Sequence, residues 1–301
     1  MPQLSTFMGL PYEPAPQGAD LVIVGAPYDG GTSYRPGARF GPRAIREESA
    51  LLHGTGLDRG PSVFGAIGAV DAGDLDLNRF SMESAMSTAT ERLTELAERN
   101  QALLMLGGDH SMTLAALRAA HKVHGPVAVL HLDAHSDTYP PVDGGRYHHG
   151  TPFRWAIWEK LVDPARMIQV GIRGHVPYAG ALEFARARGV RIVTAPDIDR
   201  IGVGSLMSMI QECVGDGPLY VSCDIDVVDP AFAPGTGTPS PGGLSSRELL
   251  AILRGIGDLQ PIGCDVVEVA PAYDHGGATA LLAAEIGYEL IYQYARSRRG
   301  R

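Results

Sequence analysis

The chain has 301 residues, of which 45% are hydrophobic, and a formal net charge of -9 at pH 7. This length and apolar content suffice for a packed core and are compatible with a single domain over residues 1–301. The acidic balance argues against nucleic acid or an anionic membrane surface as partner. The three cysteines lack CxxC spacing, which favours buried core residues in a reducing compartment over a disulfide or thiolate metal site.

The N-terminal segment is not typical of a secretory signal. Residues 1–16 contain prolines, without a basic region followed by an apolar run. No apolar run reaches the roughly 18 residues needed to cross a membrane. We therefore expect a cytoplasmic protein without membrane spans.

Short apolar runs alternate with helical patterns along the whole chain. Continuous apolar runs are typical of strands in a parallel sheet that is covered on both faces. The alternation therefore predicts one doubly wound α/β domain. The predicted strands are 21–25, 102–106, 127–132, 167–170, 190–193, 219–223 and 262–267.

Helices are predicted between these runs from apolar spacing and capping residues. In the first, Met86, Ala89 and Leu93 recur at three- and four-residue steps and form an apolar stripe. Ser245 and Glu248 have the spacing of a capping box at the start of the last predicted helix. The predicted helices are 83–100, 113–121, 181–188 with Gly189 as its end, and one running through Leu253.

Acidic and imidazole side chains follow three of the predicted strands. The segments are Gly107-Gly108-Asp109-His110-Ser111, Asp133-Ala134-His135-Ser136-Asp137 and Asp224-Ile225-Asp226. The carboxyl ends of parallel strands form the ligand-binding edge of an open α/β sheet, so we expect these groups to meet. A nucleotide site is not favoured, because the GxG pairs at 202–204 and 255–257 lack the third glycine and no GxxxxGK[ST] motif occurs.

Convergence of these groups predicts a metal centre. Residues two apart in an extended segment point to one side, and four carboxylates with two imidazoles would carry a charge near -4 that must be neutralised. Two divalent ions balance that charge. Oxygen-rich ligands without thiolate suit Mn²⁺, with Zn²⁺, Co²⁺ and Fe²⁺ as alternatives. The predicted ligands are His110, Asp133, His135, Asp137, Asp224 and Asp226.

Four nearby residues are predicted to have structural roles instead. Cys223 points to the opposite side of its strand from Asp224. His131 lies inside its strand and is interpreted as a buried, hydrogen-bonded histidine. Asp109 and Asp229 are interpreted as side chains that hold loop backbone.

The three strand-end segments, the third extended to Ser-Cys-Asp-Ile-Asp-Val-Val-Asp-Pro at 222–230, resemble the signature motifs of the ureohydrolases, the arginase–agmatinase family. The resemblance extends nearly end to end and is closest to the agmatinase branch. Residues 144–151 are also similar to the proclavaminate amidinohydrolase branch. Further matching segments are 25–29, 35–42, 233–239 and 267–271.

The resemblance implies an eight-stranded, mostly parallel sheet in a three-layer α/β/α sandwich, assembled as homotrimers or homohexamers. It also implies two Mn²⁺ per chain. One ion would be held by His110, Asp133, Asp137 and Asp224, and the other by Asp133, His135, Asp224 and Asp226.

The expected reaction is hydrolysis of a guanidino group to urea and a primary amine. Two metal ions supply hydroxide near neutral pH, and Asp137 takes the proton and passes it to the leaving amine. Glu268, which follows the strand 262–267, is predicted to hold the guanidinium by paired hydrogen bonds. His149 matches a family histidine that shuttles protons or steadies the substrate, whereas the role of His148 is open.

The expected substrate is agmatine, cleaved to putrescine. Asp143 would then meet its distal ammonium, whereas Arg146 favours an acidic substrate such as guanidinobutyrate, guanidinopropionate or a proclavaminate precursor. Two other classes of protein are alternatives: a deacetylase-like hydrolase with a single zinc, and a non-catalytic metal-binding relative. The first would need only one Asp/His/Asp set, and the second would predict broken ligands.

Overall fold

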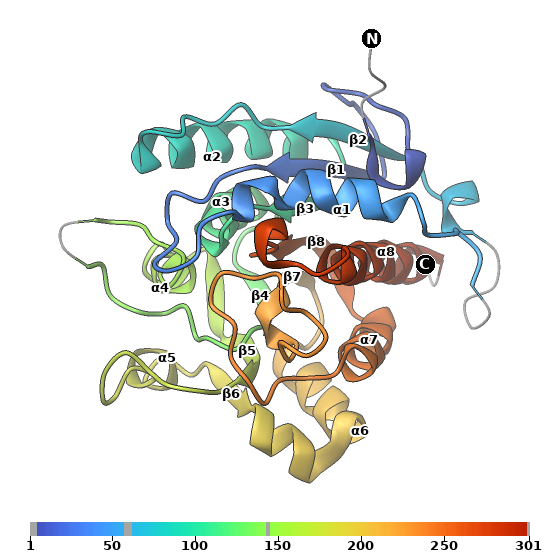
Figure 1. Cartoon of the computed structure of the whole chain (residues 1–301). Coiled ribbons are helices and arrows are strands. Elements are labelled where there is room, and N and C mark those ends of the chain that lie inside the picture. Colours follow the sequence, from blue (N-terminus) through green and yellow to red (C-terminus); the bar gives the residue numbers. More distant parts are fainter. Residues whose placement is uncertain (1–4, 57–61, 143–144, 300–301) are drawn as a thin grey trace.

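The computed structural model describes residues 5–56, 62–142 and 145–299 (Figure 1). Its centre is one eight-stranded sheet in the order β2-β1-β3-β8-β7-β4-β5-β6, and every pairing is parallel. The α/β fold and the eight-stranded sheet are thereby confirmed. The strands are β1 Leu21–Ala26, β2 Ala69–Asp74, β3 Leu103–Gly107, β4 Val127–Leu132, β5 Val162–Ile172, β6 Arg191–Thr194, β7 Pro218–Asp224 and β8 Gln260–Val267.

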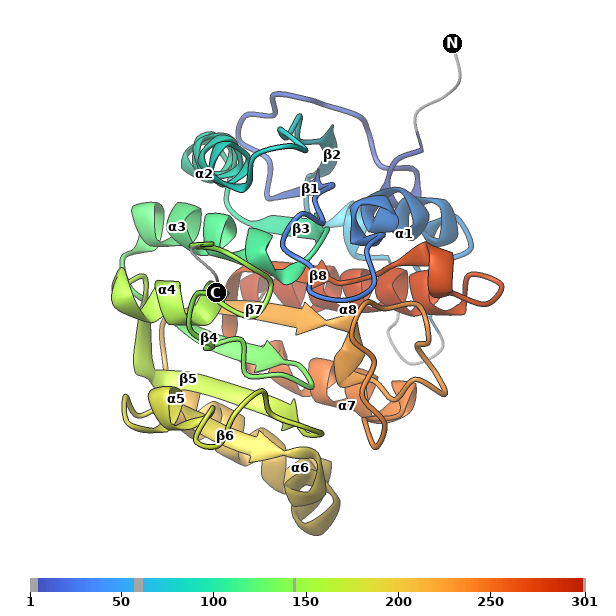
Figure 2. The same cartoon turned by 60° about the vertical axis from the view of Figure 1, so that its left-hand side comes forward.

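Helices cover both faces of the sheet (Figures 1 and 2). One face packs against α1 Gly41–Ser49, α6 Ala195–Val214, α7 Ser246–Gly255 and α8 Ala278–Arg299. The other packs against α2 Met82–Arg99, α3 Thr113–His124, α4 Pro152–Trp158 and the short α5 Glu183–Arg186. Each face buries its own hydrophobic cluster, so the three-layer sandwich is confirmed. Short 3-10 helices are η1 Phe7–Gly9, η2 Ala38–Phe40, η3 Val63–Gly65, η4 His110–Met112, η5 Ile225–Val227, η6 Ile256–Asp258 and η7 Pro271–Tyr273.

Most predicted elements are present, and those missed have weak local patterns. The capping box of α7 forms as predicted, with Ser245 and Glu248 bonded reciprocally. Strand β2 was missed because its sequence, Ala-Val-Asp-Ala-Gly-Asp, is half polar, as suits an edge strand. Helix α6 was missed because its glycines interrupt the apolar pattern, and Gly202 has a non-helical φ of 73°. Helices α1, α4 and α8 were also not predicted.

The topology places the sequence motifs on neighbouring strands. Strands β3, β8, β7 and β4 are consecutive in the sheet, and each is followed by one of the predicted site segments. Parallel strands end at the same edge, so these segments meet there. Among the described residues, no helix is long and apolar enough to span a membrane.

Candidate metal centre and active site

The structure brings the six predicted ligands together at the carboxyl edge of the sheet. They come from η4 after β3, from the loop after β4, and from the end of β7 with η5. All are buried except His135, whose side chain is 26% exposed. The cluster is thus shielded from water but open on the side of one imidazole.

One group of ligands surrounds the Nδ1 atom of His110. Carboxylate oxygens of Asp133, Asp137 and Asp224 lie 3.1, 3.0 and 3.3 Å from it. Ligands about 2.1 Å from one ion, at right angles to each other, lie about 3 Å apart. The Nδ1 atom is buried and has no hydrogen-bond partner. The spacing therefore fits a shared cation.

A second group surrounds the Nδ1 atom of His135. It lies 3.0 Å from Oδ2 of Asp226 and 3.5 Å from Oδ1 of Asp133. Since Oδ2 of Asp133 faces His110, the two oxygens of one carboxylate face the two imidazoles. This is the arrangement that a bridging carboxylate between two ions requires.

Close backbone packing and unusual backbone angles position these side chains. A Cβ atom at Gly108 would lie 1.8 Å from the carbonyl oxygen of Tyr28, so the loop that carries His110 needs glycine there. Asp137 and Glu268 have positive φ values of 49° and 65°, which aim both side chains from left-handed backbone. Positive φ at non-glycine residues often marks functional sites.

Burial and mutual repulsion both disfavour the charged carboxylates of the cluster. Burial raises the pKa of Asp224 well above its usual range, and the charges of Asp226 and Asp133 raise it further. Burial lowers the pKa of His110, but the surrounding carboxylates of Asp133, Asp137 and Asp224 outweigh this effect and raise it strongly. Cations bound among these groups would relieve the repulsion and would compete with protons for the same atoms.

Buried hydrogen bonds fix the rings of His110 and His131. Nε2 of His110 lies 2.9 Å from Oγ of Ser222, which donates to Asp265 at 2.7 Å. His131 is bonded at both ring nitrogens, to Asp133 at 2.7 Å and to Gln169 at 3.0 Å. His131 is thus the buried, hydrogen-bonded histidine that the sequence predicts.

The predicted supporting roles of two further aspartates are also confirmed. Asp109 accepts hydrogen bonds from the backbone N–H groups of Gly31 and Ser111. Asp229 accepts hydrogen bonds from the backbone N–H groups of Ala231, Gly242 and Gly243. Cys223 lies in the hydrophobic cluster on the sheet face that α1, α6, α7 and α8 cover. None of these three side chains belongs to the described groups that could hold a metal ion.

Glu268 and His149 lie beside the metal-ligand cluster. Oε1 of Glu268 accepts a hydrogen bond from the His110 backbone N–H at 2.9 Å and lies 3.1 Å from Nδ1 of His149. Burial lowers the pKa of His149, but Glu268 and the charges of Asp137 and Asp109 raise it to about 9. Oε2 of Glu268 is buried without a hydrogen-bond partner, so this oxygen can accept from a bound cation.

A cavity of about 500 Å³ extends outward from the ligands. This volume is typical of a small-molecule site. Both histidines of the 147–151 segment line it, but His148 uses its ring nitrogens to bond Gly150 and Pro140. The lining residues are Ser33, His135, Asp137, Tyr139, Pro140, Val142, His148, His149, Gly150, His175, Val176, Pro177, Tyr178, Asp224 and Thr238.

The two residues predicted to meet the substrate tail do not both reach this cavity. Asp143 lies outside the described residues. The Arg146 guanidinium lies 4.4 Å from the ring centre of Trp155 and 3.7 Å from Glu159, and lines a different hollow. Cation–π contact and ion pairing hold it there, so the structure does not bring Arg146 to the candidate site.

Sequence reasoning missed several residues that border the site. Ser33 contacts His149, and His175 and Tyr178 form part of the cavity wall. Arg173 donates hydrogen bonds to the carbonyl groups of Asp226 and Val227 and so holds η5 in place. None of these residues stands in a motif that identifies its role, because each reaches the site through a loop.

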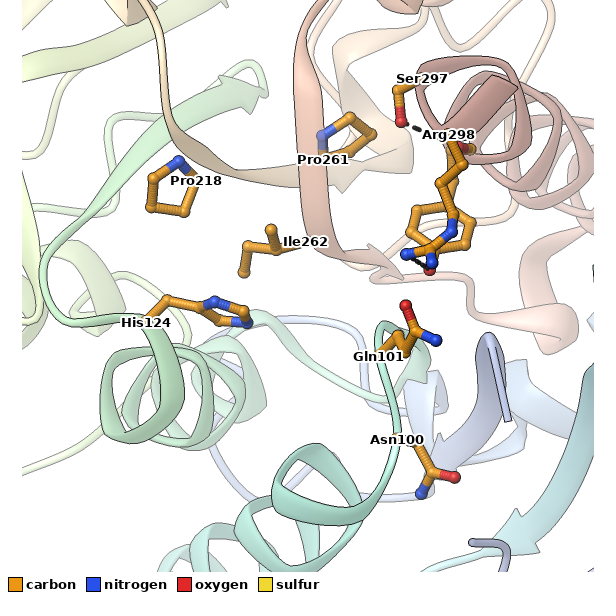
Figure 3. A pocket seen from close by; sticks show the side chains of 9 residues that line it. Asn100, Gln101, His124, Pro218, Pro261, Ile262, Ser297 and Arg298 are labelled. Carbon is orange, nitrogen blue, oxygen red and sulfur yellow. Dashed lines mark hydrogen bonds between the residues drawn. The ribbon is translucent and has the colours of Figure 1, made fainter. Parts of the chain in front are cut away.

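A second cavity, of about 480 Å³, lies at the opposite edge of the sheet (Figure 3). It is bounded by the amino ends of β7 and β8 and includes His124 of α3 and Arg298 of α8. None of the six predicted ligands lines it. The candidate active site is therefore the cavity at the carboxyl edge.

Comparisons with known proteins agree with this geometry. A model of the arginase family matches residues 19–292, and the chain belongs to this family of hydrolases. It is 63% identical over 297 residues to proclavaminate amidinohydrolase of Streptomyces clavuligerus, which covers 99% of this chain and 95% of that protein. The structure of that enzyme has a TM-score of 0.96 and covers 98% of both chains.

Two further relatives show that the family members similar to this chain differ in substrate. The chain is 42% identical over 286 residues to a mitochondrial guanidino acid hydrolase of Homo sapiens, covering 95% of this chain and 81% of that protein. It is 40% identical over 286 residues to a mitochondrial agmatinase of Gallus gallus, covering 95% and 84%. The predicted family is confirmed, whereas agmatine as substrate is not.

Proposed function

We propose that this chain hydrolyses the guanidino group of a small acidic molecule, of the proclavaminate-precursor type, to urea and a primary amine. One observation carries the proposal: a single cavity joins the predicted ligand cluster to a wall that offers hydrogen-bond donors. Among the described lining residues, the only carboxylates are Asp137 and Asp224, which belong to the cluster. The outer wall therefore suits a carboxylate tail better than an ammonium tail.

We further propose two Mn²⁺ ions as the cofactor. The fit rests on the spacing of oxygen and imidazole donors around His110 and His135, and on the unpartnered Nδ1 of His110. Two such ions, when bound, would lower the pKa of a water molecule and neutralise the cluster. The proposed ligands are His110, Asp133, His135, Asp137, Asp224 and Asp226.

Each remaining side chain of the site then has a distinct task. Glu268 accepts paired hydrogen bonds from the substrate guanidinium, which gives its buried Oε2 a partner. Asp137 takes a proton from the attacking water and passes it toward the leaving amine. His149, fixed at Nδ1 by Glu268, supplies or removes a proton at Nε2 on the cavity side.

We therefore favour an acidic guanidino compound over agmatine as the substrate. The relatives with guanidino acids or proclavaminate in their names support it, as does the composition of the wall. His175 is exposed on this wall and has no hydrogen-bond or ionic partner among the described residues. Tyr178 lies on the same loop and lines the same wall. We propose that His175 and Tyr178 bind the carboxylate of the substrate.

A substrate panel tests this proposal. The purified enzyme, reconstituted with Mn²⁺, is given guanidinobutyrate, guanidinopropionate, a proclavaminate-type guanidino acid, arginine and agmatine, and urea is measured. We expect the highest kcat/KM for one of the guanidino acids other than arginine. Preference for agmatine would contradict the acidic substrate, and no urea from any compound would contradict guanidino hydrolysis.

Metal content and assembly are measured on the same protein. Two ions per chain by elemental analysis support the binuclear centre, whereas one tightly held zinc supports the deacetylase-like alternative. We also propose a homotrimer or homohexamer, which light scattering coupled to gel filtration tests. A monomer at working concentration would contradict that assembly.

A further inference from the structure

Two segments that are distant from His149 in sequence contact its ring. Oγ of Ser33, in the loop after β1, lies 2.7 Å from Nε2, and Oε1 of Glu268, after β8, lies 3.1 Å from Nδ1. The backbone N–H of His149 donates to the carbonyl of Gly31 at 3.0 Å. The loop after β1 therefore contacts this histidine through both its backbone and a side chain.

The loop that carries Ser33 is itself anchored. The N–H of Gly31 donates to Oδ2 of Asp109 at 2.7 Å, and the hydroxyl of Thr32 donates to the carbonyl of Asp29 at 2.9 Å. Asp109 is completely buried. The position of Ser33 next to the imidazole is therefore a product of buried contacts rather than of a free surface loop.

The two ring nitrogens of His149 have partners with different hydrogen-bonding capacity. The carboxylate of Glu268 can only accept, so Nδ1 carries a proton in both states of the ring. Nε2 gains and loses the second proton, and its partners are the backbone N–H of Ser33, at 3.3 Å, and the Ser33 hydroxyl. An N–H group can only donate, whereas a hydroxyl can donate or accept. The hydroxyl is thus the partner that fits Nε2 in either state.

The two residues also differ in their exposure to water. The side chain of His149 is only 14% exposed, whereas Ser33 is an exposed residue on the cavity rim. A path from Nε2 through Oγ therefore leads from the partly buried ring to solvent.

We propose that Ser33 is the positioning residue that connects His149 to bulk water. The Oγ atom accepts the Nε2 proton while its own hydroxyl proton passes to a water molecule. Imidazolium becomes imidazole and water becomes hydronium, with the serine unchanged; the reverse transfer restores the ring. This inference rests on the proposed function, in which His149 changes its protonation state during each turnover.

Variants at two adjacent hydroxyl residues test the proposal in the Mn²⁺-loaded enzyme. Ser33→Ala removes the bridge, Ser33→Thr retains a hydroxyl, and Thr32→Ala removes a neighbouring hydroxyl that donates to the carbonyl of Asp29 in its own loop. The kcat and KM for the best guanidino acid are measured across pH, with and without added imidazole buffer. We expect Ser33→Ala to lower kcat about tenfold or more, since proton transfers by positioned groups contribute about 10²–10⁴-fold.

In Ser33→Ala, KM should change less than about twofold, the kcat–pH profile should shift, and added imidazole should restore much of the loss. Ser33→Thr and Thr32→Ala should keep the wild-type profile. A wild-type kcat and pH profile in Ser33→Ala would overturn the proposal. An increase in KM alone, without rescue by imidazole, would also overturn the proposal and would make Ser33 a substrate contact.

A second measurement separates this inference from the proposed function. Nitrogen-15 NMR of the histidine rings, in the enzyme loaded with diamagnetic Zn²⁺, reports the bonding of His149 Nε2 without substrate. Its signal should move in Ser33→Ala but not in Thr32→Ala, and an unmoved signal would refute the bridge. If the wild type released no urea from any guanidino compound, the proposed function would fail while this result would still stand.

Discussion

Replacing His175 by aspartate should reverse the substrate preference of the enzyme. The imidazole lies exposed on the outer wall of the cavity, without a partner among the described residues. A hydrogen bond to a charged group contributes about 1.5–3 kcal/mol, and the exposure of His175 argues for the lower end. A new carboxylate about 4 Å from the substrate carboxylate adds about 1 kcal/mol of repulsion in water.

Together these effects cost an acidic substrate about 2.5 kcal/mol, which corresponds to about a 70-fold fall in kcat/KM. Agmatine should gain about 1 kcal/mol from the new carboxylate, or about fivefold. The ratio of the two kcat/KM values should therefore change a few hundredfold. Urea release at low substrate concentration measures both values directly.

A matched control is His124→Asp, which makes the same change in charge at the opposite edge of the sheet. It should leave the ratio unchanged, with thermal unfolding used to verify that both variants fold. Equal changes in kcat/KM for acid and agmatine in His175→Asp, or no change, would refute the proposed contact with the substrate tail. Tyr178→Phe should lower kcat/KM for the acid alone by a smaller factor.

Three further outcomes are expected from the proposed metal centre and its neighbour Glu268. Gly108→Ala should abolish metal binding measured by calorimetry, because its Cβ would lie 1.8 Å from the Tyr28 carbonyl oxygen; unchanged affinity would contradict the packing argument. Metal affinity should fall as pH decreases, because the raised pKa values of Asp224 and His110 make protons compete with the ion. Calorimetry in buffers of different ionisation enthalpy should detect proton release, and its absence would contradict the raised pKa values. Glu268→Gln should raise KM about tenfold or more, because it weakens charge-assisted hydrogen bonds to the guanidinium. The variant should retain two metals per chain. An unchanged KM would count against guanidinium binding by Glu268.

The sequence by itself determined the class of fold and the residues of the proposed metal site. Continuous apolar runs predict parallel strands because burial on both faces selects apolar residues locally. The polar residues that follow three of these runs share a sheet edge by the geometry of parallel strands. This is why His110, Asp133 and Asp224 could be assigned together although they are far apart in sequence. The extent of the single domain, residues 1–301, stays a prediction.

Tertiary structure alone decided which loop residues face the cavity. Arg146 was a candidate for the substrate tail, but contacts with Trp155 and Glu159 hold it over another hollow. Ser33 and His175 reach the site from the loops after β1 and β5. Loop direction depends on contacts between segments distant in sequence, and these contacts leave no periodic signal in the residues themselves. For this reason the sequence indicates the guanidino chemistry, whereas the features that argue for an acidic substrate lie in the folded cavity wall.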